Sequence, residues 1–359
     1  MCIYTVSMGK ARSFLVPTLS LMLLGSALAC GDSPLAPEFE KHDHVVIIEP
    51  GHHYRLVLDD VYERSEPGQR WVSGALEDSP LDHMSRRAMV FKADDFGAPL
   101  NERGIRFIEL LDAYAAPASL GVVTNFLSDD PAELAVYREL HERGTELWFH
   151  GHSHLLRGGQ SEFRDRTSHL QALSFSQGQA LAKTKLGIQF RTFGAPGNNI
   201  DEITAGVAER FSVFKVWFYG IDIKGHDLLV LPRHVDIEYP AGVLLETDEL
   251  SALVAQIALS SAPVVTLQLH PLVFSNQTFR RLEGFLDGIE RSGQFRYATP
   301  YGYWRWLQDQ GRIELTKTAE RTYLLDTTRA HYTHRVTLNP KLGDFELESV
   351  ANPGVGERW

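Results

Sequence analysis

The chain has 359 residues, of which 43% are hydrophobic and 23% charged, as in a globular protein with one large domain or two modest ones. Its formal net charge is -11, and no block of Lys or Arg offsets it, which argues against a nucleic-acid partner. Cys2 and Cys30 are the only cysteines, so we expect packing, not disulfides, to stabilise the mature fold.

The first 30 residues have the order of a secretory signal peptide. Lys10 and Arg12 precede an apolar run from Phe14 to Leu28, and small residues lead to Ala29. Cys30 stands where a bacterial lipoprotein has its acylated cysteine, in an imperfect lipobox, so lipidation and simple cleavage after Ala29 both stay open. We therefore expect an extracytoplasmic protein that is periplasmic, anchored to a membrane through a lipidated Cys30, or secreted.

The segments that flank the main domain are expected to be small. Residues 31–43 predict a tether, and residues 44–86 predict an N-terminal β segment. In that segment the runs Val45–Ile48 and Tyr54–Leu58 flank a Pro-Gly turn and predict a hairpin. Residues 313–359 contain further β-prone runs and predict a β appendage without an assigned chemical role.

Strand and helix patterns alternate from residue 87 to residue 312. Apolar runs of strand length are followed by capped amphipathic segments. Strands are expected at 88–93, 120–126, 145–149, 190–193, 214–219 and 264–269, and helices at 101–114, 131–143, 169–186, 201–210 and 277–291. Repeated units of this length imply an α/β fold with a parallel sheet or barrel.

Reactive side chains follow three of these strands directly. Asp94 and Asp95 follow the first strand, His150 and His154 the third, and His270 the last. Because the carboxyl ends of parallel strands meet at one rim of a barrel, these residues are expected to lie together.

The two aspartates can serve one site only if the strand has ended. Adjacent residues of an extended chain point in opposite directions, and the following Phe96-Gly97 favours an ending there. Alone, Asp-Asp before Gly is more often a solvated turn, so the functional interpretation depends on the order of all the motifs.

Two imidazoles four residues apart indicate a metal site. Catalytic zinc usually has three protein ligands and an open position for water, so His150 and His154 need one carboxylate in addition. His152 lies between them and is expected in an exposed loop.

The motifs together resemble the polysaccharide deacetylase family, the NodB-homology carbohydrate esterases, over residues 87–312. Asp94-Asp95-Phe-Gly97 matches the first motif, His150 and His154 the second, and Leu267-Gln-Leu269-His270 the fifth. The third motif is matched only by Gly194-Ala-Pro-Gly197, where Gly194 replaces the arginine that steadies the base. The fourth is not clearly present, because Trp217 lies near its expected place without the aspartate. The chain therefore looks like a divergent member.

The resemblance implies a distorted (β/α) barrel with small N- and C-terminal β additions. It implies that Asp95, His150 and His154 hold a divalent metal, with zinc the expected ion, while Asp94 acts as base and His270 as acid. The implied activity is metal-dependent removal of acetyl groups from N-acetylated or O-acetylated sugars of a cell-envelope or extracellular polysaccharide. Leu267 or Leu269 is expected to line a slot for the acetyl methyl group.

Two other functions stay open from the sequence. One is a non-catalytic carbohydrate-binding protein on the same fold, and the other is a metal hydrolase of another C–N or ester bond. Trp217, Trp304 and Trp306 could stack on sugar rings, although aromatic residues in such positions are more often part of the core.

Overall fold

The computed structural model describes residues 45–58, 70–72, 81, 86–157, 160–221, 228–233, 235–319, 322–337 and 345–350. The chain divides into a unit of residues 1–39 and a unit of residues 40–359, and all described residues belong to the second. The predicted signal peptide, Cys30 and most of the tether fall in the first unit, outside the described residues, so the leader and its lipidation stay predictions. Among the described residues, no helix has both the length and the apolar character that a membrane span requires.

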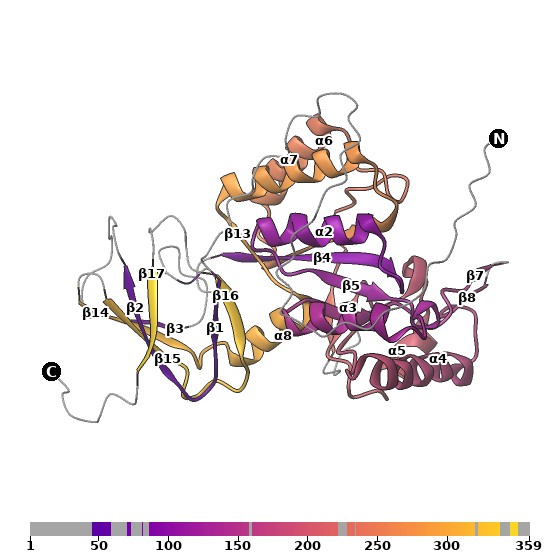
Figure 1. The fold of residues 1–359 in the computed structure, drawn as a ribbon, viewed down its shortest axis with the longest axis horizontal. Helices are drawn as coiled ribbons and strands as arrows, with labels where there is room; N and C mark the ends of the chain where they lie inside the picture. The colour runs from indigo at the N-terminus through magenta and orange to yellow at the C-terminus, as the bar shows by residue number, and fades with distance from the viewer. Residues whose placement is uncertain are drawn as a thin grey trace, which may run out of the picture. The chain divides into compact units, whose positions relative to one another are not determined.

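The largest sheet is parallel and curls into a barrel (Figure 1). Its strands follow the order β11-β10-β9-β6-β5-β4-β12, and β13 also pairs with β4. Beyond β11, Val235 forms a parallel bridge with Leu267 of β12, which brings the two ends of the sheet together. This nearly closed, distorted (β/α) barrel confirms the predicted fold class. The strands are β4 (Arg87–Phe96), β5 (Ser119–Val122), β6 (Glu146–Phe149), β9 (Thr192–Gly194), β10 (Val216–Phe218), β11 (Leu229–Leu231), β12 (Val264–Leu269) and β13 (Phe295–Tyr297).

Helices connect the strands, and polar residues and glycine cap their ends. Asn101 and Asp130 accept hydrogen bonds from backbone N–H groups at the starts of α2 and α3, and Gly293 ends α7 with a φ of 60°. The helices are α2 (Glu102–Ala113), α3 (Pro131–Glu142), α4 (Ser168–Leu181), α5 (Glu202–Ala208), α6 (Thr247–Leu259), α7 (Asn276–Ser292) and α8 (Pro300–Asp309). Single turns are η1 (Thr124–Phe126), η2 (Ala182–Leu186), η3 (Pro196–Asn198) and η4 (Pro271–Val273).

Alternate residues of several barrel strands belong to different cores. In β4, Met89, Phe91 and Ala93 pack in the large core between the sheet and the helices, whereas Ala88 and Val90 belong to a separate cluster inside the barrel. That interior cluster also contains Trp148, Val216, Phe218 and Leu231. We call the alternate residues of a strand that face the inside of the barrel its interior row. A polar side chain that continues this row at the carboxyl end of the strand therefore points into the barrel.

The additions at the two ends of the domain pair with each other. An antiparallel sheet has the order β17-β2-β15-β14-β3, and β1 pairs with β16. The predicted hairpin of β1 with β2 is therefore wrong, since both strands have distant partners that a local turn signal cannot reveal. The strands are β1 (Val45–Ile48), β2 (His53–Leu58), β3 (Arg70–Val72), β14 (Glu314–Ala319), β15 (Thr322–Asp326), β16 (His334–Thr337) and β17 (Phe345–Val350).

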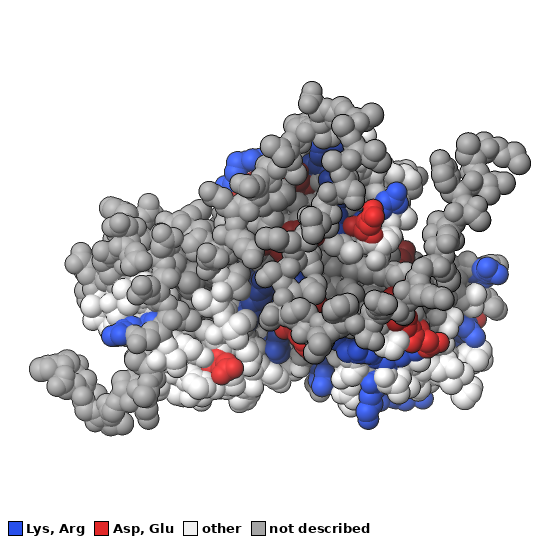
Figure 2. All heavy atoms as spheres, in the orientation of Figure 1, with Lys and Arg blue, Asp and Glu red and all other residues white. Residues whose placement is uncertain are grey.

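The tryptophans considered for sugar stacking are buried. Trp217 lies in the core between sheet and helices, Trp304 in the interior cluster, and Trp306 in the core of the β additions. Their role is packing, as the alternative interpretation held. On the face shown in Figure 2, the described acidic and basic side chains are interspersed over the surface.

Candidate metal centre

Asp94 and Asp95 lie at the carboxyl end of β4, and a backbone irregularity lets both serve one site. Asp94 continues the interior row of Ala88 and Val90 and is 1% exposed. The strand does not end at Ala93, before the two aspartates, as expected, but runs to Phe96. Instead, Asp95 has a φ of 72°, and the register with β5 shifts between Ala93 and Phe96. This bulge breaks the alternation of side chains, so the Asp95 carboxylate also turns toward the site.

His150 follows β6 on its interior row, two residues after Trp148. It is 1% exposed, and its Nδ1 lies 2.9 Å from the carbonyl oxygen of Gly194 on β9. The Nδ1–H therefore donates to that carbonyl, which leaves Nε2 with a free lone pair directed at the site.

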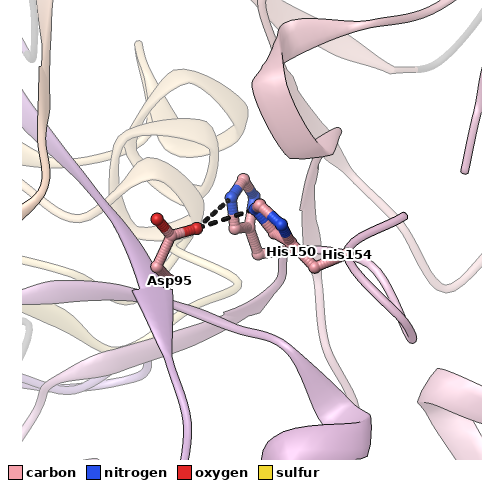
Figure 3. A group of neighbouring side chains, drawn as sticks. All are labelled: Asp95, His150 and His154. Atoms are coloured by element: carbon pink, nitrogen blue, oxygen red, sulfur yellow. Dashed lines mark ion pairs between the residues drawn. The ribbon is translucent and has the colours of Figure 1, made fainter. Parts of the chain in front are cut away.

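Asp95, His150 and His154 converge on one point (Figure 3). Asp95 Oδ1 lies 3.2 Å from His150 Nε2 and 2.8 Å from His154 Nε2. The same Oδ1 is buried and has no hydrogen-bond partner among the described residues, although both ring nitrogens lie within ion-pair distance of it. One carboxylate oxygen and two imidazole nitrogens are a ligand set that zinc accepts, and three ligands leave a position open. The residues therefore fit a divalent cation.

The electrostatics of the cluster agree with that fit. Burial tends to raise the pKa of Asp95, but the hydrogen-bonding geometry and charge of His150 and His154 outweigh it and hold the pKa far below its ordinary range. Burial also tends to lower the pKa of His154, and the nearby Asp95 carboxylate reverses this and raises it. The lowered pKa keeps Asp95 ionised, which is the form that binds a cation.

A buried carboxylate holds the loop that carries His154. The Glu162 side chain accepts hydrogen bonds from the backbone N–H groups of His152, Ser153 and His154, at 2.5, 3.1 and 2.8 Å, and from the hydroxyl of Ser174. His154 has a φ of 52°, a conformation that needs such support.

Gly151 makes room for this carboxylate. It has a φ of 87°, and a Cβ at this position would lie 2.7 Å from Glu162 Oε2. Loop and carboxylate therefore fit together only with glycine at position 151.

Asp94 lies beside the cluster and is held from two sides. Lys92 Nζ lies 2.7 Å from its Oδ1 and 2.5 Å from its Oδ2, and Gln268 Nε2 donates to Oδ2 at 2.7 Å. His150 Nε2 is 3.6 Å from the same Oδ2. Asp94 therefore adjoins the candidate metal position without being one of its three ligands.

His270 follows β12 and faces Asp94 from the other side of the site. Its Nε2 lies 3.9 Å from Asp94 Oδ2, and its Nδ1 lies 2.6 Å from Glu238 Oε2. Glu238 also accepts from the backbone N–H of His270 at 2.8 Å, so one carboxylate fixes both the ring and the main chain. Burial tends to lower the pKa of His270, but the bond to Glu238 and the charge of Asp94 raise it above its ordinary value.

The structure thus brings together all five site residues expected from the sequence, Asp94, Asp95, His150, His154 and His270. His152 takes no part in the cluster, and its Nδ1 lies 3.0 Å from the Thr124 hydroxyl. The expected acetyl slot is wrong for Leu267 and Leu269, which are both fully buried on the helix-facing side of β12.

Sequence reasoning missed four residues of the site. Lys92 could have been found, because a lysine interrupts the buried run of β4 on the same face as Asp94. Gln268 likewise shares the interior row of His270. Glu162 and Glu238 come from segments without a recognisable motif, and only the fold places them.

The sequence of this chain has little similarity to the known proteins with which it was compared. No family model matches it, and neither does any curated protein. Solved structures do match. The likeness is to carbohydrate esterase family 4, the family that the motifs resemble.

The matched structures include an esterase, a deacetylase and a pseudoenzyme. A family 4 acetyl xylan esterase from Clostridium thermocellum, in complex with a cobalt ion, is 17% identical with a TM-score of 0.44, and the match covers 62% of this chain and 92% of that one. A chitin deacetylase from Colletotrichum lindemuthianum is 12% identical with a TM-score of 0.46, covering 61% and 87%. A family pseudoenzyme from Bacillus anthracis is 13% identical with a TM-score of 0.42, covering 60% and 63%. At these values the likeness assigns no role to any residue here.

Proposed function

We propose that this chain is a metal-dependent hydrolase that removes acetyl groups from N-acetylated or O-acetylated sugars of a cell-envelope or extracellular polysaccharide. The observation that carries the proposal is the convergence of Asp95 Oδ1 with His150 Nε2 and His154 Nε2, beside a second buried carboxylate at Asp94. The predicted secretory leader fits such a substrate, and export stays a prediction.

The three converging side chains would hold the cation, with zinc the expected ion. A divalent ion bound there supplies Lewis acidity, which lowers the pKa of water and polarises a carbonyl group. The residues around the cation site hold the ligands in place. The carbonyl oxygen of Gly194 fixes the tautomer of His150, and the Glu162 carboxylate binds the backbone of the loop that carries His154.

Asp94 is the proposed base. Its buried carboxylate adjoins the ligand cluster, 3.6 Å from His150 Nε2, where it can take a proton from water that attacks the acetyl carbonyl. His270 is the proposed acid on the opposite side. Its protonated Nε2 can donate to the departing sugar nitrogen or oxygen, while Glu238 holds Nδ1 and stabilises the charged ring.

Release of acetate tests the proposal. We expect purified protein to release acetate from acetylated oligosaccharides, to lose this activity with a chelator and to regain it with added zinc. Asp94→Asn should reduce turnover by about 10²- to 10⁴-fold while the zinc content stays at one per chain. Metal-independent release would exclude the metal mechanism, and sugar binding without any release would favour the binding-protein alternative.

A substrate panel separates the remaining alternative. Acetylated sugars, simple acetate esters and other amides are compared at equal concentration by their kcat/KM. A preference for a non-sugar C–N or ester bond would keep the metal hydrolase but replace the proposed substrate.

A further inference from the structure

Gly194 stands where the family resemblance predicts an arginine beside the base, and the barrel interior has no room for one. A Cβ on Gly194 would lie 2.7 Å from Trp148 Cζ3 and 3.2 Å from Lys92 Cε. Trp148 is fully buried in the interior cluster, so its rigid ring cannot move aside without disturbing that packing. An arginine at this position would have to displace both side chains.

Lys92 fills the same space with a cation of its own. It lies two residues before Asp94 on β4, so both side chains point into the barrel. Its side chain is 0% exposed, and the rings of Trp148, Phe218 and Tyr219 lie 5.3, 5.9 and 5.4 Å from Nζ. These rings restrict the position of the ammonium group. The group pairs with the Asp94 carboxylate, and both carboxylate oxygens lie within 2.7 Å of Nζ.

We propose that Lys92 is the positioning residue of the base. It clamps the Asp94 carboxylate from the same strand and takes the place of the arginine that the family resemblance predicts at position 194. Gln268 completes the clamp by donating to Oδ2 at 2.7 Å. The proposal rests on the proposed function for the role of Asp94 as base, whereas the clamp itself is a property of the folded protein. A buried carboxylate without this cation would lose its charge partner and its fixed direction.

Stability measurements on the full-length chain test the clamp without any substrate. Lys92→Met should destabilise the protein because it leaves Asp94 buried and unpaired. The double variant Lys92→Met/Asp94→Asn removes both charges and should regain most of the lost stability. The double variant also covers the case in which Lys92→Met alone fails to fold. Equal destabilisation by the single and the double variant would overturn the clamp.

Kinetics then show whether the clamp serves the base. With zinc bound, Lys92→Met should lower kcat by about 10²-fold with KM changed less than about twofold, because only proton transfer is affected. Added to Asp94→Asn, Lys92→Met should cause no further loss, since Lys92 acts through Asp94. Lys185→Met, which removes a lysine paired with Asp129 at 2.8 Å, is the matched control and should leave kcat unchanged.

The two proposals fail in different ways. A wild-type protein that releases no acetate contradicts the proposed function, while the stability cycle still decides the clamp. A Lys92→Met variant with wild-type kcat, or a crystal structure of it with Asp94 still in its place, would show that Lys92 does not position the base.

Discussion

Two clusters of the described residues each combine one aspartate with two histidines, and only one of them presents free ligand atoms. Asp95 meets the Nε2 atoms of His150 and His154 with a single buried oxygen. Asp309 at the end of α8 accepts hydrogen bonds from the backbone N–H groups of His331 and Tyr332 and, at 2.8 Å, from His334 Nε2.

The difference lies in how the lone pairs are used, not in the residue types. The Asp309 carboxylate is 0% exposed and its oxygens accept bonds that join α8 to β16 and the turn before it, whereas the ring of His331 only approaches at 3.9 Å. At Asp95 the oxygen and both imidazole nitrogens converge within 4.8 Å of one another. The first cluster is therefore expected to bind a cation, and the second to hold the barrel and the β additions together.

The largest effect is expected from removing a histidine of the first cluster. His150→Ala should lower bound zinc from one per chain to near zero and acetate release by at least about 100-fold, because a direct ligand matters no less than its supporting residues. His334→Ala is the matched control and should keep both zinc and turnover. Elemental analysis with an acetate assay checks this, and zinc retained by His150→Ala would remove His150 from the ligands.

Asp309→Asn should instead reduce stability, by about 3 kcal/mol, because a buried acceptor of several hydrogen bonds is replaced by a weaker one. Burial tends to raise the pKa of Asp309, but its bonds to His334, His331 and Tyr332 lower it. The stabilisation is therefore complete above the unfolded pKa of about 4 and is lost as pH falls through the lower folded pKa.

Urea unfolding at neutral and acidic pH measures this contribution. The loss of unfolding free energy in Asp309→Asn, relative to the wild type, should be smaller at acidic pH. The zinc affinity of this variant should equal that of the wild type. A deficit that grows on acidification would mean that the carboxylate is not the stabilising form.

Glu162→Gln should weaken zinc binding by about 10- to 100-fold, since the amide cannot accept all the N–H bonds that hold the His154 loop. Competitive titration with a chromophoric chelator gives the affinity. Glu314→Gln, which alters a glutamate paired with Arg329 in the β additions, should leave it unchanged. Unaltered affinity in Glu162→Gln would show that the loop is held by other contacts.

The smallest effect is expected in the pH profile. His270 must be protonated to act as an acid, so kcat falls as pH rises through its pKa, which Glu238 raises. Glu238→Gln should move this alkaline limb to lower pH by about 1 unit. Glu246→Gln, at the surface beside Arg281, should not move it. An unmoved limb in Glu238→Gln would assign that limb to another group.

Much of the strand and helix order of residues 87–312 could be predicted because apolar runs, caps and glycines are local signals, and the meeting of Asp94, His150 and His270 follows from the parallel sheet. The strands β11 and β13 and the helices α6 and α8 were not among the predicted elements. The bulge at Asp95 could not be predicted, because it depends on pairing with β5. The role of Glu162 could not be predicted either. Its partners are backbone N–H groups of the His154 loop, and their direction is defined only in the folded loop. Pairing of β1 with β16 joins distant ends of the chain and leaves no local trace.

Anomalous diffraction at the zinc edge, from crystals of the zinc-loaded protein, would locate the bound ion without any assumption about activity. We expect one strong peak within coordinating distance of Asp95 Oδ1, His150 Nε2 and His154 Nε2, and none at Asp309. No peak at the first cluster, or one at Asp309 instead, would contradict this expectation.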